Sequence, residues 1–573
     1  MLEEHPAQVP TPKSEPVIGR DASVQAPVRD EVVGSERALK GACMPQRPLE
    51  ILSTIVANGL REVRELPLPM PEMPGVLEIL RVGRSLQFLS GAERKVVYQQ
   101  FVDAMLARED VAAIGASTLP HLVRYSVNGE RADLIRHLLN HREGNHRLAT
   151  KLVIDILRSC QSLEQLREVV QTVGREELSH LASRQVREFV AWAVIGTAMR
   201  AAKVPQSVST RLDLERADAR IVELRAALNE RIDIANADPI LRGTEVAKRF
   251  RKIANEDLAY LERQLKRFKA TERMASRRSK EGSPEAAIRR RRGLVSTMVE
   301  MMKVEFTFGI NLTCEKNRLG RNVRVWKVEE VKKIHDLLSK KIPEGLTLFT
   351  PHLKEFRRVA GKGGEYNGLR DRDGQIHISD DGINDTVFAK QFDMRSPLLA
   401  ILAHEQGHSL HIGEGRTAKT LISSRDGKIL GPHDHFFNGA EFAELSGWRG
   451  YELSRCKIQH NGQAILIDGQ THPLDAPTRF QGRVVVFEYD SSEKLVFSYN
   501  AEAPFSARSY SRSSPWEDAA ESFTEYVLMP QRLARMAPHK FFFWDLHIGK
   551  YEEKGWLYEI AHQKLQQLQE PAR

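Results

Sequence analysis

Two histidines and a glutamate stand at helical spacing in the segment LLAILAHEQGHSLHIGEGR, residues 398–416. His404 and His408 are four residues apart, so on a helix both imidazoles project from one face and can bind a single metal ion. Glu405 is rotated by about 100° from His404, which places its carboxylate beside the ion, where it can accept a proton from bound water. This HExxH pattern predicts a catalytic metal site.

Zinc is the natural ion for two imidazoles and a carboxylate, with the fourth position left to water. We expect one zinc ion per chain. The alternative is a pair of ordinary core histidines, because a chain with 19 histidines can match HExxH by chance. The preceding LLAILA is apolar all round, so the helix is expected to be buried, and burial of these polar groups without a partner would cost several kcal/mol. A metal ion supplies that partner.

A third metal ligand is needed besides the two histidines, and several later residues are candidates for it. The first candidates are Glu414 and the nearby His411, but His411 stands where a helix-breaking glycine would be needed to return Glu414 to the ion. His433 and His435 alternate as on an extended segment. Glu441, in NGAEFAELSGW, lies 33 residues after His408 on a short helical stretch and is a reasonable ligand.

A further candidate, Glu517, begins an acidic helix face in SPWEDAAESFTEYVLMP, where Glu517, Glu521 and Glu525 follow one another at steps of four. Ser514 and Glu517 also have the spacing of a capping box, which would explain Glu517 as a helix-start residue without any metal. The residues alone therefore leave Glu441 and Glu517 open.

HEQGH followed by an ExxxE pair on a second, alanine-containing helix resembles the gluzincin zinc metallopeptidases. Tyr510, seven residues before Glu517, extends the similarity to the catalytic domain of anthrax lethal factor-like peptidases. The resemblance covers about residues 305–550 at best and is specific only at these motifs.

This resemblance implies a role for each matching residue. The implied metal ligands are His404, His408 and Glu517. Glu405 would be the general base, Tyr510 would face the substrate carbonyl, and Glu521 would be an acidic neighbour. His408 and Glu517 lie 109 positions apart, a longer gap than the family usually shows, which implies an inserted β-rich segment and keeps Glu441 in consideration.

The elements that must position these residues follow from hydrophobic periodicity. We expect an α+β protein with an all-helical N-terminal half, followed by a zincin-like C-terminal metallopeptidase domain that carries an inserted β-rich segment. The predicted parts are a disordered Pro-rich arm at 1–47, a helical bundle at 48–206, a long coiled-coil-like helical hairpin with a basic linker containing RRRRG at 207–299, and the metallopeptidase domain at 300–573.

Within the C-terminal domain, helices are expected at 326–342 and after two Ser-Pro pairs, Ser396-Pro397 and Ser514-Pro515. The predicted strands are LTLFT at 346–350, an edge strand GQIHIS at 374–379 that could pair with an extended peptide substrate, AILI at 464–467, and a hairpin of RVVVFEY and LVFSYN at 483–500.

Composition limits the other possibilities. Lys and Arg exceed Asp and Glu by 85 to 76, an excess too small for this length to indicate a nucleic-acid binder. Four widely spaced cysteines suggest no disulfide framework or thiolate metal site, and no segment is apolar enough to span a membrane. The first thirty residues lack a signal-peptide core. We expect a cytoplasmic protein, or one secreted without such a signal.

The expected function is therefore that of a zinc-dependent endopeptidase acting on protein or peptide substrates, and the resemblance implies a bacterial toxin or effector. The alternative is an interaction scaffold, in which the helical N-terminal half binds a protein partner and the metallopeptidase-like domain is inactive or accessory.

Overall fold

The computed structural model describes the chain in segments, and the predicted arm at residues 1–47 lies outside them. Residues 1–51 and 52–573 form separate units, and all described residues belong to the second. The described residues are 89–107, 119, 123, 126–141, 146–206, 214–275, 283–315, 325–350, 353–360, 368–370, 375–384, 396–411, 442–443, 445–451, 457–458, 464–467, 470–473, 478–480, 483–489, 494–500, 505, 509–548 and 555–569.

Short helices occupy the described residues between 91 and 201. They are α5 (Gly91–Ala107), α7 (Asn128–Asn140), α8 (His146–Arg158), α9 (Leu163–Val173), α10 (Arg175–Ser179), α11 (Arg184–Ala191), a π-helical turn η1 (Trp192–Gly196) and α12 (Thr197–Ala201). Helix α9 illustrates why they form: Ser162 caps its first turn by accepting the Gln165 N–H at 3.2 Å, and its apolar stripe is buried. Among the described residues, no helix is both long and apolar enough to cross a membrane.

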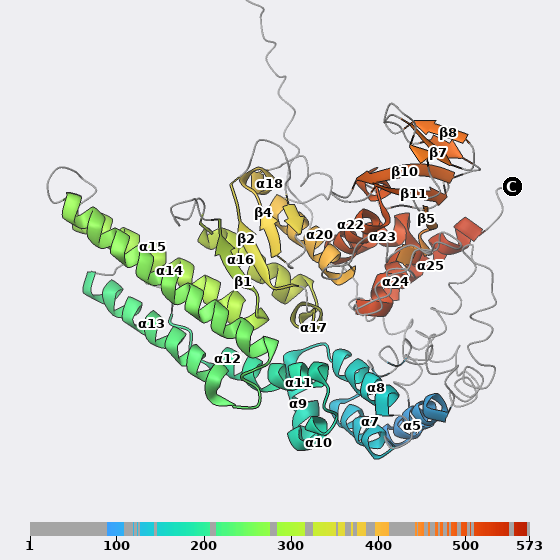
Figure 1. The fold of residues 1–573 in the computed structure, drawn as a ribbon, viewed down its shortest axis with the longest axis horizontal. Helices are drawn as coiled ribbons and strands as arrows, with labels where there is room; N and C mark the ends of the chain where they lie inside the picture. The colour runs from blue at the N-terminus through green and yellow to red at the C-terminus, as the bar shows by residue number, and fades with distance from the viewer. Residues whose placement is uncertain are drawn as a thin grey trace, which may run out of the picture. The chain divides into compact units, whose positions relative to one another are not determined.

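Three long helices follow, where a two-helix hairpin and a basic linker were expected. They are α13 (Leu214–Ala237), α14 (Glu245–Ala275) and α15 (Pro284–Phe308) (Figure 1). The linker prediction for RRRRG was wrong, because these arginines lie inside α15. Arg291 is buried and donates to Asp218 of α13 at 2.6 Å and to Glu272 of α14 at 2.5 Å. Neighbouring acids thus neutralise a charge run that would otherwise repel itself.

A four-stranded sheet begins directly after α15. Its strands are β1 (Asn311–Cys314), β2 (Glu355–Arg358), β3 (Gly368–Arg370) and β4 (Gln375–Ile378), in the order β1-β2-β4-β3. The first two and β4 are parallel, and β3 is antiparallel to β4. The predicted edge strand GQIHIS is therefore internal, because β4 is hydrogen-bonded on both sides, and β3 forms that edge of the described sheet.

The strand predicted at 346–350 is instead the helix α17 (Glu344–Leu348). Gly345, Leu346, Thr347 and Leu348 are all buried, so the segment shows no alternation that would distinguish a strand from a buried helix. The helix predicted at 326–342 is confirmed as α16 (Val328–Asp336), which continues into a π-helical turn, η3 (Leu337–Lys341).

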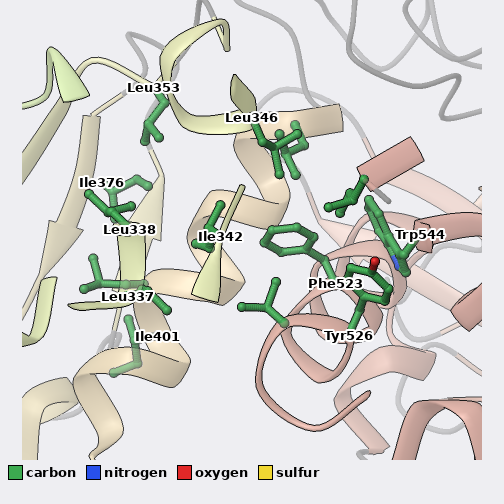
Figure 2. Packing of buried hydrophobic residues seen from close by; sticks show 14 of the residues in the cluster. Leu337, Leu338, Ile342, Leu346, Leu353, Ile376, Ile401, Phe523, Tyr526 and Trp544 are labelled. Carbon is green, nitrogen blue, oxygen red and sulfur yellow. The ribbon is translucent and has the colours of Figure 1, made fainter. Parts of the chain in front are cut away.

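The apolar face of the sheet, formed by Leu312, Phe356, Ile376 and Ile378, belongs to one hydrophobic cluster with helices from both sides of the β-rich segment. These helices are α16, α20 (Pro397–His411), α22 (Pro515–Leu528), α23 (Pro530–Met536), α24 (Pro538–Ile548) and α25 (Gly555–Gln569). Figure 2 shows part of this packing, with Phe523 and Tyr526 beside Trp544.

Most of the described residues between α20 and α22 belong to short strands. The first group, β5 (Trp448–Tyr451), β9 (Thr478–Phe480), β10 (Arg483–Tyr489) and β11 (Lys494–Asn500), forms an antiparallel sheet in the order β5-β11-β10-β9. The second is a three-stranded sheet of β6 (Lys457–Ile458), β7 (Ala464–Ile467) and β8 (Gln470–Pro473). The predicted strand AILI and the β10–β11 hairpin are confirmed. The protein is α+β.

A buried pair of carboxyl groups lies where the long helices meet the sheet. Asp257 of α14 is hydrogen-bonded to Glu305 of α15, and Glu305 accepts the Leu312 N–H of β1 at 2.7 Å. Burial raises the pKa of Asp257 to about 7 and also holds the pKa of Glu305 well above its usual range. The pair therefore holds protons that the unfolded chain releases near pH 4.

This pair should make the folded protein less stable as the pH rises. Since the folded pKa of Asp257 exceeds the unfolded value, its protonated form favours folding below about pH 4, and that contribution is lost between about pH 4 and pH 7. Asp257→Asn should remove a difference in the free energy of unfolding of about 1–3 kcal/mol between pH 5 and pH 8, measured by urea unfolding. Asp233→Asn, at an exposed position of α13, is the control. If Asp257→Asn kept the wild-type difference in unfolding free energy between pH 5 and pH 8, the raised pKa of Asp257 would be contradicted.

Candidate metal centre

Helices α20 and α22 carry the predicted site residues and pack against each other. Both predicted Ser-Pro starts are confirmed, because α20 begins at Pro397 and α22 at Pro515. Ser514 caps α22 by accepting the Glu517 N–H at 3.3 Å. Every residue of α20 from Ala400 to Leu410 is buried, as the apolar sequence before the histidines predicted.

Three side-chain atoms converge between these helices, although Glu517 lies more than a hundred residues after the two histidines in sequence. His404 Nε2 is 3.2 Å from His408 Nε2 and 3.1 Å from Glu517 Oε2, and His408 Nε2 is 3.4 Å from the same carboxylate oxygen. The three residues form a compact group of possible metal ligands. Of the two open candidates for third ligand, Glu517 is thus the one that the described structure brings to the histidines.

The spacing of these atoms fits a metal ion. Ligands about 2.0 to 2.1 Å from a tetrahedral ion are separated from one another by about 3.3 Å, close to the three distances found here. The capping box does not account for the Glu517 side chain. Its backbone N–H is capped by Ser514, while its carboxylate is directed at the two histidines.

Glu521 supports the first histidine from the other side of the ring. Its Oε1 lies 3.2 Å from His404 Nδ1, and its side chain is 0% exposed. A carboxylate at Nδ1 holds the proton on that nitrogen and leaves the Nε2 lone pair directed at the convergence point, the usual arrangement for a metal-binding imidazole.

The electrostatics of the group favour a cation at its centre. Burial alone would raise the pKa of Glu517, but the two histidines outweigh burial and hold the pKa well below its usual range. Burial would lower the pKa of His404, but Glu517 and Glu521 outweigh it and raise that pKa well above its usual value. The two carboxylates thus favour a positive charge at this position, which a bound metal ion would supply.

Glu405, which follows His404 directly in the sequence, is buried, with 6% of its surface exposed. Helix geometry turns it about 100° from His404, as the HExxH pattern predicted. Its backbone carbonyl accepts a hydrogen bond from the Ser409 hydroxyl at 3.2 Å. The carboxylate is therefore carried by a buried turn of α20, next to His404 in the sequence.

Gly407 allows the two helices to approach closely, a role that the sequence reading did not assign to it. A Cβ atom at this position would lie 2.8 Å from Ala520 Cα and 3.3 Å from the Ala520 carbonyl oxygen. Contacts of that length with backbone atoms force the helices apart. The absence of a side chain at Gly407 thus brings α22, and with it Glu517, within reach of the histidines.

The structure describes less of the other residues that were considered for the site. His411 is the last residue of α20, and Tyr510 lies in a short 3-10 helix, η6 (Ser509–Arg512), just before α22. Their side chains are outside the described part of the structure. The remaining contenders for third ligand, Glu414, His433, His435 and Glu441, also fall outside the described residues.

A second group of possible ligands, Asp103, His137 and His141, lies on α5 and at the end of α7. His137 Nε2 is 2.7 Å from Asp103 Oδ1, a hydrogen-bonding distance shorter than the separation of ligands around one ion. The Asp103 side chain is 51% exposed. A surface contact between Asp103 and His137 explains this group, whereas the group on α20 and α22 is buried and its three atoms lie at the separations expected around one ion.

Comparison with protein-family models, with curated proteins and with solved structures finds no match to this chain.

Proposed function

We propose that the protein is a zinc-dependent endopeptidase of the gluzincin type, with zinc held by His404, His408 and Glu517. The observation that carries the proposal is the convergence of two imidazole nitrogens and one carboxylate oxygen within 3.1 to 3.4 Å in a buried position. When bound there, zinc supplies a Lewis acid and lowers the pKa of its water to about 7.

The chain's own residues would then transfer the proton, orient a ligand histidine and stabilise the oxyanion. Glu405 accepts the proton of the attacking water and delivers it to the leaving amine. Glu521 keeps His404 in the tautomer that presents Nε2. Tyr510, in the turn that leads into α22, donates a hydrogen bond to the developing oxyanion, which is worth about 2 to 4 kcal/mol in comparable sites.

The substrate is an extended peptide segment of a protein. Strand β3 is the edge of the described sheet on the side of α20, and it contacts that helix. An edge strand offers unpaired backbone groups to which a peptide can add as a further strand. This replaces the predicted role of GQIHIS, because β4 is internal.

The wider proposal is a zincin-like domain similar to that of anthrax lethal factor-like peptidases, in a bacterial toxin or effector. The α+β arrangement, with a small sheet beside the histidine helix and the glutamate on a later helix, supports this fold class.

Zinc analysis of the purified full chain, together with cleavage of a peptide library, tests the proposal. We expect one zinc ion per chain and hydrolysis that a chelator abolishes and added zinc restores. A chain that retains no zinc after dialysis and cleaves no peptide would refute it. That outcome would favour the alternative, in which the helical N-terminal half binds a protein partner and the C-terminal domain is inactive.

A further inference from the structure

A fully buried ion pair lies directly behind the glutamate ligand. Asp518, the residue after Glu517, has 0% of its side chain exposed, as does Lys540 of α24. The Lys540 ammonium lies 2.6 Å from Asp518 Oδ1 and 2.7 Å from Oδ2. Trp448 of β5 donates its indole N–H to Asp518 Oδ2 at 2.9 Å. Three elements from distant parts of the chain thus meet on one carboxylate.

The surroundings of this pair are aromatic. The Lys540 ammonium lies 4.4 Å from the centre of the Phe505 ring and 5.8 Å from that of Phe442. Burial raises the pKa of Asp518 and lowers that of Lys540, and the attraction between the two charges opposes both shifts. Removing both charges from water is costly, and well-packed apolar residues in place of such a pair often leave stability unchanged or higher.

A buried pair of this kind is therefore poorly explained by stability alone, and its position suggests another role. Asp518 follows Glu517 on the first turn of α22, so the two side chains point about 100° apart. One carboxylate faces the histidines, and the other is fixed from behind by Lys540 and Trp448. The first turn of α22 thus cannot rotate or slide without breaking three charge-assisted or buried hydrogen bonds.

We propose that Asp518, Lys540 and Trp448 are positioning residues that fix the first turn of α22, so that Glu517 is held at ligand distance from His404 and His408. The inference rests on the proposed zinc site and deepens it. If the inference holds, the β-rich segment also helps to position the metal ligands, because Trp448 belongs to β5.

The test replaces both charges together, because either charge left alone in these buried, aromatic surroundings would be uncompensated. In the full chain, Asp518→Leu/Lys540→Met should keep a thermal stability close to that of the wild type, because apolar packing replaces the ion pair while the Trp448 N–H loses its acceptor. Its zinc affinity, measured by competition with a chelating dye, should fall at least tenfold, the scale of lost outer-sphere support. A merely structural pair would show the reverse, with lower thermal stability and unchanged zinc affinity.

Asp545→Asn is the matched control. Asp545 is a buried carboxylate of α24 that also contacts α22. It accepts hydrogen bonds from Tyr558 of α25 and from Tyr526, which lies nine residues after Glu517 on α22. This variant should lose stability and keep its zinc affinity. If it loses as much affinity as the double variant, the effect is not specific to the first turn and the proposal fails.

Trp448→Phe covers the case in which the double variant does not fold. It keeps an aromatic ring against Phe497 and Tyr499 and removes only the N–H donor to Asp518. We expect a three- to tenfold loss of zinc affinity, and an unchanged affinity would overturn the proposal. A wild-type chain that binds no zinc would refute the proposed function itself, whereas equal binding by wild type and variants would refute only the positioning role.

Discussion

Glu405→Gln should leave zinc in place and lower peptide hydrolysis by about 100- to 10,000-fold, the range of a lost general base. Glutamine has nearly the same shape and keeps the buried turn of α20 intact, but it cannot accept the proton of the attacking water. Steady-state kinetics on the best library peptide and zinc analysis of the same preparation measure the two effects separately.

Ser409→Ala is the control for this change. Ser409 is buried on the same helix and donates only to the Glu405 backbone carbonyl, so its loss should leave zinc content unchanged and activity within a few-fold. Full activity in Glu405→Gln would remove Glu405 from the mechanism. Loss of zinc in that variant would show that Glu405 is a ligand instead of a base.

Glu517→Ala should lose the metal. It removes one of three ligands and leaves two imidazoles facing a cavity, so we expect zinc affinity to fall by more than about 100-fold, the upper end of what an outer-sphere contact contributes. Equilibrium dialysis against buffered zinc measures the loss. Activity should disappear with the metal.

Glu441→Ala is the informative counterpart, because Glu441 was the other open candidate. It should retain full zinc. If Glu517→Ala kept its metal while Glu441→Ala lost it, the assignment of the third ligand would be wrong, although the two histidines would stand.

The histidine helix could be predicted well because its determinants are local. An apolar turn, a Ser-Pro start and the i, i+4 spacing of His404 and His408 all act within fifteen residues. The same holds for α16 and for the β10–β11 hairpin, in which alternation and a short polar turn are sufficient. These elements need no information from the rest of the chain.

Predictions failed where the deciding contact was distant or the pattern was uniform. Residues 346–350 are buried on all sides, so no periodicity distinguishes helix from strand. Arg291 needs Asp218 and Glu272, 73 and 19 residues away, before a helix becomes preferable to a solvated linker. The internal place of β4 depends on β3, a three-residue strand that carries almost no pattern.

The third ligand could be narrowed but not chosen from the residues. The Ser514 cap and the proposed ligand role make the same demand on sequence spacing, and only the fold shows that Ser514 caps the Glu517 backbone N–H while the Glu517 carboxylate faces the histidines. The role of Lys540 was not predicted although its surroundings offered a sign: a lysine directly before the apolar run FFFW, at the start of a helix, implies a buried charge that needs an acidic partner.

The contact at Gly407 also restricts which sequences can carry this site. HExxH allows any residue at its two middle positions, but here the second of them faces Ala520 backbone at 2.8 Å from where a side chain would begin. Relatives that share this helix pair should therefore carry HExGH together with a small residue three positions after the glutamate ligand. A pattern that joins these two segments would find divergent members that neither short motif can identify alone.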